Sequence, residues 1–276
     1  MVVLVTGANG QVGQAIREVS AGATDLEFIF ASSQQLDVTN PESVENNFNT
    51  YKPDYCINAA AYTAVDKAES EPENAYKLNA TAVEILAAAC VGTNCTLIQI
   101  STDFVFDGTA TSPYSESDRP NPLSVYGASK LAGEYNAAKC PKHFIIRTSW
   151  VYSKYGNNFF KTMLRLASER EKLTVVDDQR GTPTFAPDLA LALIHIIRSQ
   201  SSSYGTYHYS NLGEATWFEF AREIFVKNNV HTVLEPCETA AFPTAARRPA
   251  YSVMDKQKIM TTFNLSIRHW RDAIPG

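Results

Sequence analysis

The feature that most constrains the fold is a short apolar strand that runs directly into a glycine-rich turn and then into a helix. Residues 2–5 are apolar, the turn spans Gly7 to Gly13, and helical spacing follows over residues 11–20. A strand, a tight turn and a helix in this order begin a βαβ unit, whose strands lie parallel in one sheet. The start of the chain therefore predicts an α/β fold.

The same alternation continues through the first half of the chain. Further strands are predicted over residues 26–30, 55–59, 96–101 and 143–149, and helices over 41–51, 73–91 and 124–138. Crossover connections between parallel strands are almost always right-handed and place helices on both faces of the sheet. We therefore expect a Rossmann-type, doubly wound parallel sheet.

The second half of the chain is less regular. Helices are predicted over residues 158–171, 187–198 and 217–228, strands over 173–176 and 206–210, and a loop over 235–249. We expect a first domain over residues 1–149 and a smaller C-terminal substrate-binding lobe over residues 150–276. Residues 184–212 are expected to pack back onto the sheet.

The glycine turn indicates a dinucleotide site in the first domain. Its glycines recur at i, i+3 and i+6, which differs from the G-x-G-x-x-G spacing but serves the same geometry: a positive φ and a close backbone approach to a pyrophosphate. The N–H groups at the helix start then bind the anion. A glycine turn that binds nothing is the alternative, and the strand–turn–helix context favours the dinucleotide. The cofactor-binding residues predicted here are Gly7, Asn9, Gly10, Gln11, Val12 and Gly13.

The end of the second strand bears on the choice of cofactor. NAD-preferring proteins often carry an acidic residue there, which binds the ribose 2′-hydroxyl. This strand ends in Ala31-Ser32-Ser33, without an acid, so a 2′-phosphate meets no carboxylate. NADPH is therefore favoured, with NADH also compatible, and Ser32 is predicted to contact it. Asp37 and Val38 are predicted to contact the adenine, unless they only form the loop before the next helix.

A tyrosine and a lysine one helical turn apart are the strongest catalytic candidates. Tyr126 and Lys130 share a helix face. A free tyrosine has a pKa of about 10, and a nearby ammonium is expected to lower it. Upstream, Ser101 and Thr102 end an apolar strand at its carboxyl edge, where ligands bind in open α/β sheets. A lone Tyr-x-x-x-Lys pair arises by chance, but the glycine turn and the strand-end hydroxyl favour a reductase with Thr102, Tyr126 and Lys130 as its catalytic residues.

With these residues in place, longer blocks carry a family resemblance that spans nearly the whole chain. They are residues 10–13 (GQVG), 58–69 (NAAAYTAVDKAE), 101–106 (STDFVF), 125–134 (VYGASKLAGE), 147–152 (RTSWVY), 156–159 (GNNF), 181–184 (GTPT) and 246–249 (ARRP). The sequence resembles the extended short-chain dehydrogenase/reductases, and among them the reductases of 4-keto nucleotide sugars.

The resemblance implies a reaction and further site residues. A hydride from NAD(P)H would reduce C4 of a dTDP-linked 4-dehydro-6-deoxy-L-mannose, the last step of dTDP-L-rhamnose synthesis, with Tyr126 as proton donor. Implied in the cofactor groove are Ala59, Ala60 and Ala61, beside Tyr126 and Lys130. Implied on the substrate side are Thr63, Val65, Thr102, Asp103, Trp150, Asn158 and Arg247, with Arg247 and Asn158 holding the diphosphate.

Departures from the family pattern keep alternatives open. Phe104 stands where members often have tyrosine, and Ala15 stands where some carry a glutamate that helps build a metal-bridged dimer, so no structural metal is expected. A dehydratase would need a second carboxyl group at Phe104. A reductase of another 4-keto-6-deoxy sugar stays open, as does a non-catalytic NADP-binding subunit similar to the regulatory β subunit of methionine adenosyltransferase.

The composition excludes other classes of protein. The net charge of −5 is spread along the chain, unlike the clustered basic surface of nucleic-acid binders. Five scattered cysteines without a C-x-x-C pair indicate neither a disulfide framework nor a zinc site. Residues 1–6 lack the features of a secretory signal and no apolar run could span a bilayer, so we expect no membrane partner and a cytoplasmic location. A monomer or a homodimer is expected.

Overall fold

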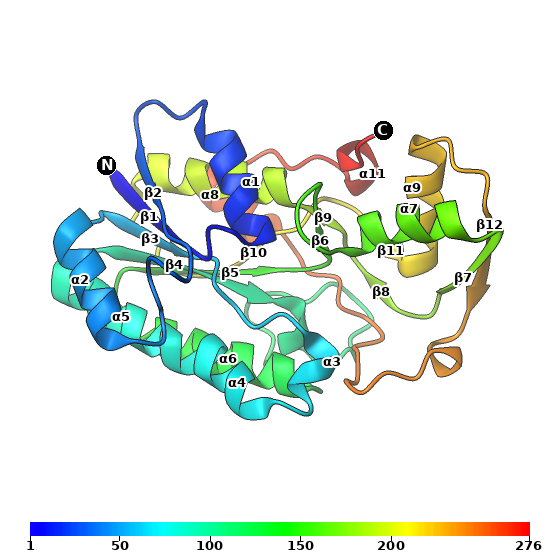
Figure 1. The fold of residues 1–276 in the computed structure, drawn as a ribbon, viewed down its shortest axis with the longest axis horizontal. Coiled ribbons are helices and arrows are strands. Elements are labelled where there is room, and N and C mark those ends of the chain that lie inside the picture. Colours follow the sequence, from blue (N-terminus) through cyan, green and yellow to red (C-terminus); the bar gives the residue numbers. More distant parts are fainter.

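A six-stranded parallel sheet forms the larger part of the structure, a computed structural model in which all residues 1–276 are described. Its strands are β1 (Val2–Thr6), β2 (Glu27–Phe30), β3 (Tyr55–Asn58), β4 (Thr96–Thr102), β5 (His143–Thr148) and β10 (Gly205–His208). They lie in the order β10-β5-β4-β3-β1-β2, and every neighbouring pair is parallel (Figure 1).

The strand order reverses at β1. The chain goes from β1 outward to β2 on one side and then returns to β3 on the other. In open α/β sheets the crevice at the carboxyl ends of two such strands is where ligands bind. The sheet therefore places a crevice between the residues that follow Thr6 and those that follow Asn58.

Helices cover both faces of the sheet because the strand side chains alternate between two apolar cores. Val3 and Val5 belong to the core beneath α1 (Gln11–Ser20), α8 (Ala186–Ser199) and α10 (Gln257–Phe263). Leu4 belongs to the core beneath α2 (Pro41–Tyr51) and α5 (Ala82–Thr93), and α6 (Val125–Ala137) lies on the same face. This arrangement confirms the expected doubly wound sheet. None of the helices has the length and apolarity needed to cross a membrane.

One long helix was predicted over residues 73–91, and the structure divides it. A short helix α4 (Pro72–Tyr76) passes into a π-helical turn (Lys77–Thr81), and α5 then begins at Ala82. The turn carries the buried Asn79, whose side chain contacts a neighbouring loop and helix α6. Single π turns inside helices are frequent at functional sites.

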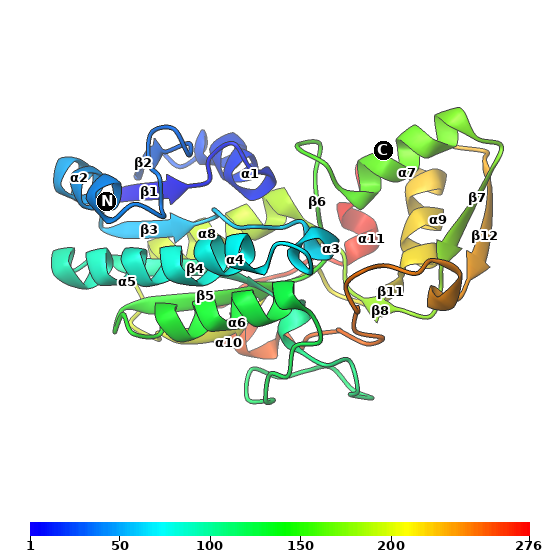
Figure 2. The same ribbon diagram turned by 60° about the horizontal axis from the view of Figure 1, so that its bottom comes forward.

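The second half of the chain adds a smaller lobe beyond the carboxyl edge of the sheet, seen at the right of Figures 1 and 2. Its helices are α7 (Phe159–Glu169), α9 (Trp217–Lys227) and α11 (Trp270–Ala273), and its strand pairs are β6 (Val151–Tyr152) with β9 (Thr184–Phe185), β7 (Lys172–Val176) with β12 (Val233–Cys237), and β8 (Arg180–Gly181) with β11 (Ala215–Thr216). A separate apolar cluster forms its core.

Within residues 235–249, the expectation of a loop is wrong at the start. Strand β12 continues to Cys237 because it pairs in parallel with β7, and a 3-10 turn follows at Thr239–Ala241. Residues 186–208 supply α8 and β10 to the sheet side, and β10 adds to the sheet beside β5.

Candidate active site

The glycine turn is built so that backbone lies against backbone. Gly7 has φ +62°, and a Cβ there would lie 2.6 Å from the amide nitrogen of Ala60. A Cβ on Gly13 would lie 2.5 Å from the carbonyl oxygen of Gly7. Only glycine permits both approaches. The first turn of α1 begins after Gly10 without a side-chain cap or an acidic residue, so its N–H groups are available to an anion.

The loop after β3 forms the other wall of the crevice. Residues Ala59, Ala60 and Ala61 follow Asn58 and are partly buried. The Ala60 amide nitrogen lies within hydrogen-bond distance of Asn58 Oδ1 at 3.3 Å, and Asn58 also accepts from Thr6 at 2.6 Å. The predicted alanines and the glycine turn thus meet at the strand-order reversal.

The predicted catalytic residues come together at the carboxyl end of β4. Thr102 ends this strand, and Tyr126 and Lys130 lie in the first two turns of α6, which is capped at its N-terminus by Ser124. The start of α6 packs tightly there, since a Cβ on Gly127 would lie 2.2 Å from the Phe104 carbonyl oxygen.

Burial is the main influence on the protonation of Tyr126 and Lys130. It raises the pKa of Tyr126 to about 12, while a hydrogen bond with Thr102 acts in the opposite direction. It lowers the pKa of Lys130 to about 8, which the charge of Glu134 opposes. The expected net lowering of the Tyr126 pKa is therefore wrong, because desolvation outweighs the contacts that favour the phenolate. The phenol is desolvated, and Lys130 Nζ donates instead to the Ile100 carbonyl at 2.6 Å.

Asp103 lies behind Thr102. Thr102 Oγ1 donates to Asp103 Oδ1 at 3.1 Å, and the other carboxylate oxygen is buried without a hydrogen-bond partner. Burial raises the pKa of Asp103 to about 6. Phe104, the next residue, packs edge-on against Tyr126, with ring centroids 5.6 Å apart.

At the end of β2 the predicted adenine-side residues make local contacts. The Ser32 hydroxyl donates to Gln35 at 2.9 Å. Asp37 accepts from the backbone and hydroxyl of Thr39, and these hydrogen bonds hold the pKa of its carboxyl below the usual range. Val38 is buried. The glycine turn reaches this edge through a hydrogen bond from the Ala8 amide to the Ala31 carbonyl.

Asn158, predicted to hold the diphosphate, connects the glycine turn to the lobe. Its Oδ1 accepts from the Lys161 amide and caps α7, while its Nδ2 donates to Gln11 Oε1 at 2.7 Å and to the Ser153 carbonyl at 2.8 Å. Gln11 Nε2 donates to the Val151 carbonyl at 3.0 Å. The Asn158 side chain therefore ties the glycine turn to the lobe.

Trp150 lies between the sheet and the lobe in an unusual conformation. Its φ is +47°, a left-handed conformation rare for a bulky residue. Its indole stacks on that of Trp217, with centroids 3.5 Å apart and planes inclined by 7°. Backbone strain of this kind is found mainly at functional sites, where surrounding contacts hold it. The stacking of Trp217 on Trp150 was not predicted, because the two residues lie far apart in the sequence.

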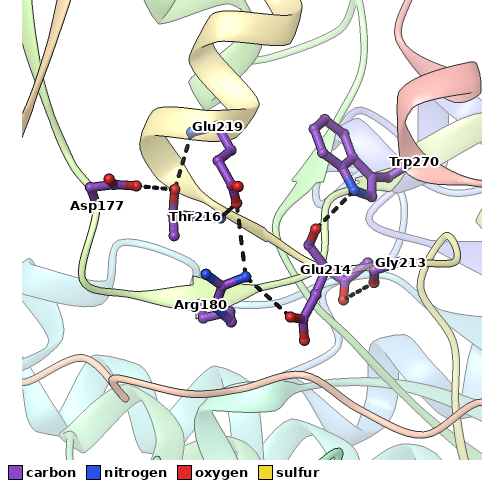
Figure 3. A network of polar contacts seen from close by, with 8 residues as sticks. Asp177, Arg180, Gly213, Glu214, Thr216, Glu219 and Trp270 are labelled. Carbon is purple, nitrogen blue, oxygen red and sulfur yellow. Dashed lines mark hydrogen bonds and ion pairs between the residues drawn. The ribbon is translucent and has the colours of Figure 1, made fainter.

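A polar network connects the elements of the lobe that include Gly181 and Trp217 (Figure 3). Arg180 in β8 donates to Glu214 at 3.1 Å, and the carbonyl of Glu214 accepts from the Trp270 indole at 3.1 Å. Thr216 caps α9, with Glu219 N donating to its hydroxyl at 3.1 Å. These contacts join β8, β11, α9 and α11 into one support.

Gly181 in β8 is expected to tolerate no side chain. A Cβ there would lie 2.7–2.8 Å from three atoms of the Trp150 indole. Gly181→Ala is therefore expected to displace the indole and to destabilise the fold by roughly 1–3 kcal/mol, the usual cost of overpacking. Thermal denaturation followed by tryptophan fluorescence measures this, and an unchanged midpoint would contradict the contact.

The remaining predicted residues lie on a surface between α3 (Val65–Ala68) and the C-terminal segment. Thr63 is exposed just before this helix. Asp66 pairs with Arg248 at 2.7 Å, which leaves Arg248 engaged, while Arg247 is exposed. Arg247 lines a cavity of about 500 Å³ in the lobe, together with Gln179, Phe242, Thr244 and Ala246.

Asn79 is a site residue that sequence reasoning missed. Its side chain accepts from the Tyr62 amide at 2.8 Å and donates to the Tyr62 carbonyl at 3.1 Å and to Ser129 at 3.0 Å. It therefore fixes the loop after Ala61 to α6, the helix that carries Tyr126. The sequence predicts one regular helix over residues 73–91, so nothing in it indicated that Asn79 contacts other segments.

Ala15 is buried in the core of the sheet. It lies in α1, which packs against α8, and it has no exposed surface. The position at which some family members carry a glutamate is thus occupied here by a core methyl group.

Comparison with known proteins places this geometry in a family. The family model described as RmlD substrate binding domain matches residues 1–276. A dTDP-4-dehydrorhamnose reductase of Sinorhizobium fredii is 42% identical over 98% of this chain and 94% of its own length.

Solved structures agree with the family match. A dTDP-4-dehydrorhamnose reductase of Clostridium acetobutylicum superposes with a TM-score of 0.94 at 42% identity, covering 99% of this chain and 96% of its own. The enzyme of the same name from Bacillus anthracis, solved in complex with NADP, gives a TM-score of 0.95 at 40% identity with the same coverage. The chain therefore belongs to the family whose model is described as the RmlD substrate binding domain.

Proposed function

We propose that this chain reduces the C4 keto group of dTDP-4-dehydro-6-deoxy-L-mannose to give dTDP-L-rhamnose, with NADPH as the hydride donor. The observation that carries the proposal is the meeting of Thr102, Tyr126 and Lys130 at the carboxyl edge of β4. Full-length relatives named dTDP-4-dehydrorhamnose reductase support the substrate, and the relative solved with NADP supports the cofactor.

The crevice fits a dinucleotide. The close approach of Gly7 and Gly13 to neighbouring backbone leaves a side-chain-free cradle, and the first turn of α1 presents N–H groups suited to a pyrophosphate. We propose that this turn holds the pyrophosphate, with Ala59 to Ala61 along the nicotinamide side. The end of β2, with Ser32 and no acid, accommodates a 2′-phosphate.

When bound, NADPH supplies the hydride that adds to C4. We propose that the Thr102 hydroxyl hydrogen-bonds the keto oxygen and that Tyr126 protonates it as the alkoxide develops. The raised pKa of Tyr126 keeps its proton in place at neutral pH. The ammonium of Lys130 stabilises the phenolate that remains. In the free protein the Thr102 hydroxyl donates to Asp103 Oδ1, and we propose that this proton turns to the keto oxygen when the sugar binds.

The substrate is proposed to enter from the lobe side. Thr63, Val65 and Trp150 would face the sugar, and Arg247 would hold the diphosphate, because a guanidinium pairs well with phosphate oxygens. Asn158 is proposed to act indirectly, by fixing the lobe to the glycine turn.

We propose a domain boundary near residue 149. We also propose that the working form is a monomer or a homodimer, and light scattering would measure which of the two it is.

The activity is expected to fall as the pH rises through about 8. Burial disfavours the Lys130 ammonium, so this lysine loses its proton well below the ordinary lysine pKa. Above that pH the phenolate left by Tyr126 lacks its cation, and kcat should drop about tenfold per further pH unit. In Lys130→Arg, whose side chain stays charged, this alkaline decline should disappear. A decline that is identical in both proteins would contradict the assignment.

NADPH absorbance measured with dTDP-4-dehydro-6-deoxy-L-mannose tests the function. The proposal predicts turnover, stronger with NADPH than with NADH. Turnover only with another 4-keto-6-deoxy sugar would reassign the substrate. NADPH binding without turnover on any sugar of such a panel would overturn the enzyme proposal in favour of a binding subunit.

A further inference from the structure

A row of buried polar side chains crosses the sheet one residue before the catalytic edge. Ser101 in β4, Arg147 in β5 and His208 in β10 occupy matching register positions on three neighbouring strands. Each is at most 4% exposed, and Glu134 of α6, also 4% exposed, lies against the row. Buried charges are costly unless they are paired and hydrogen-bonded, so the contacts of this row define what it does.

Glu134 accepts hydrogen bonds from two members of this row, Ser101 and Arg147. Its Oε1 accepts from the Ser101 hydroxyl and from Arg147 Nε at 2.9 Å, and its Oε2 accepts from Arg147 Nη2 at 2.7 Å. This is a two-pronged ion pair of a guanidinium with a carboxylate, the geometry that gives arginine its strongest pairing. The carboxylate is thus held by one cation and one hydroxyl.

His208 completes the far end of the row as a neutral group. Burial lowers its pKa to about 3. Arg147 Nη1 has only hydrogens to donate, so the contact at 3.4 Å makes His208 Nε2 the acceptor. The ring proton then lies on Nδ1, which donates to the Tyr114 carbonyl at 3.1 Å. The charge of Arg147 is therefore balanced by Glu134 alone.

Lys130 connects this row to the proposed chemistry. It precedes Glu134 by one helical turn, and its Nζ donates to the carbonyl of Ile100, the neighbour of Ser101. Ser101 in turn precedes Thr102. The Glu134 carboxylate therefore contacts Ser101, which lies between Ile100, the residue whose carbonyl accepts from Lys130, and Thr102.

We propose that Glu134 is a positioning residue for the proposed reduction: through Ser101 it fixes the segment from Ile100 to Thr102, and through its charge it keeps the Lys130 ammonium protonated. The inference rests on the proposed function for its effect on turnover, but not for its effect on Lys130. The opposing influence of Glu134 on the lowered pKa of Lys130 agrees with it.

The titratable and charged groups around Lys130 are linked through its own helix. Tyr126 and Glu134 lie one turn away on α6; Arg147 on β5 pairs with Glu134, and His208 on β10 contacts Arg147. Asp103 after β4 acts on the pKa of Tyr126. Among them Glu134 is the group whose charge acts on the Lys130 pKa. Removing that charge therefore makes the ammonium less stable and shifts its titration to lower pH.

The test removes the charge without leaving Arg147 buried and unpaired, which would destabilise the fold. The variant Glu134→Gln with Arg147→Met keeps an amide oxygen for the Ser101 hydroxyl and takes away both charges. Ser101→Ala removes only the link to the strand. Asp188→Asn with Arg268→Met removes an ion pair of 2.7 Å remote from the site and serves as the control.

The first readout is the pH dependence of kcat and KM. In the Glu134→Gln, Arg147→Met protein the alkaline decline of kcat should begin about one pH unit lower, with a loss of about twofold at pH 7 that grows to about tenfold at pH 9 and disappears at lower pH. Ser101→Ala should lower kcat several-fold at every pH, and the control pair should leave the profile unchanged. A folded charge-removal variant with the wild-type profile would overturn the proposal.

The second readout needs no substrate. Carbon-13-labelled lysine lets NMR follow the titration of Lys130, assigned from its absence in Lys130→Met. The pKa of Lys130 should fall by about one unit in the charge-removal variant and stay in place in the control. A shift without enzyme turnover would reject the proposed function but keep the role of Glu134, whereas turnover without a shift would reject the role of Glu134.

Discussion

Tyr126→Phe is expected to lower kcat by about 10²- to 10⁴-fold, the usual contribution of a general acid. The phenol is the proposed proton donor and keeps its proton at neutral pH, and phenylalanine preserves its edge-on packing with Phe104. NADPH affinity and the denaturation midpoint should change little. Steady-state kinetics with the 4-keto sugar measure the loss.

The matched control is Tyr135→Phe. Tyr135 lies in the same helix but is 64% exposed, so loss of its hydroxyl should leave kcat unchanged. Equal losses in both variants would point to damage of α6 rather than to removal of a proton donor. A Tyr126→Phe protein with wild-type kcat would remove Tyr126 from the reaction.

Gly13→Ala is expected to weaken NADPH binding by about ten- to hundredfold, which corresponds to the roughly 1–3 kcal/mol that overpacking costs. The new Cβ would lie 2.5 Å from the Gly7 carbonyl and 2.7 Å from Ala8 Cα, so the turn must open. The N–H groups at the start of α1, which we propose bind the pyrophosphate, would move with it. Titration of NADPH fluorescence measures the affinity.

Gly92→Ala is the control for this change. No heavy atom lies within 4 Å of its added Cβ, and the residue belongs to a helix away from the crevice. The substitution should leave NADPH binding unchanged and stabilise the fold by roughly 0.5–1 kcal/mol. If Gly13→Ala binds NADPH as tightly as Gly92→Ala, the pyrophosphate does not lie in this turn.

The sheet and its helices were predictable because local patterns determine them. Val3, Leu4 and Val5 alternate between the two cores, and the glycine turn specifies the strand-to-helix connection. The π turn at Asn79 was not predictable, since it depends on contacts with Tyr62 and Ser129 far along the chain. Two-residue strands such as β6 and β8 are too short to show a period.

The candidate site was predictable where it depends on topology. Tyr126 and Lys130 share one helix, and the end of β4 brings Thr102 to them. Side-chain partners between distant segments were not: the stacking of Trp217 on Trp150 and the contact of Asn158 with Gln11 depend on how the lobe packs against the sheet. No local pattern specifies such contacts.

The pKa of Tyr126 illustrates the same limit. Sequence spacing placed a lysine one turn away and suggested a lowered pKa. The structure adds burial, which a sequence does not report, and burial raises the pKa to about 12. A phenol that keeps its proton at neutral pH is consistent with the proposed role of Tyr126 as the proton donor.

Transfer of deuterium from NADPH that carries deuterium at both positions of the nicotinamide C4 tests the central claim most directly. The claim predicts that dTDP-4-dehydro-6-deoxy-L-mannose is converted to dTDP-L-rhamnose with one deuterium at C4 of the sugar for each NADPH oxidised, and that Tyr126→Phe forms the same product slowly. A product without deuterium at C4, or NADPH bound but never oxidised, would contradict it.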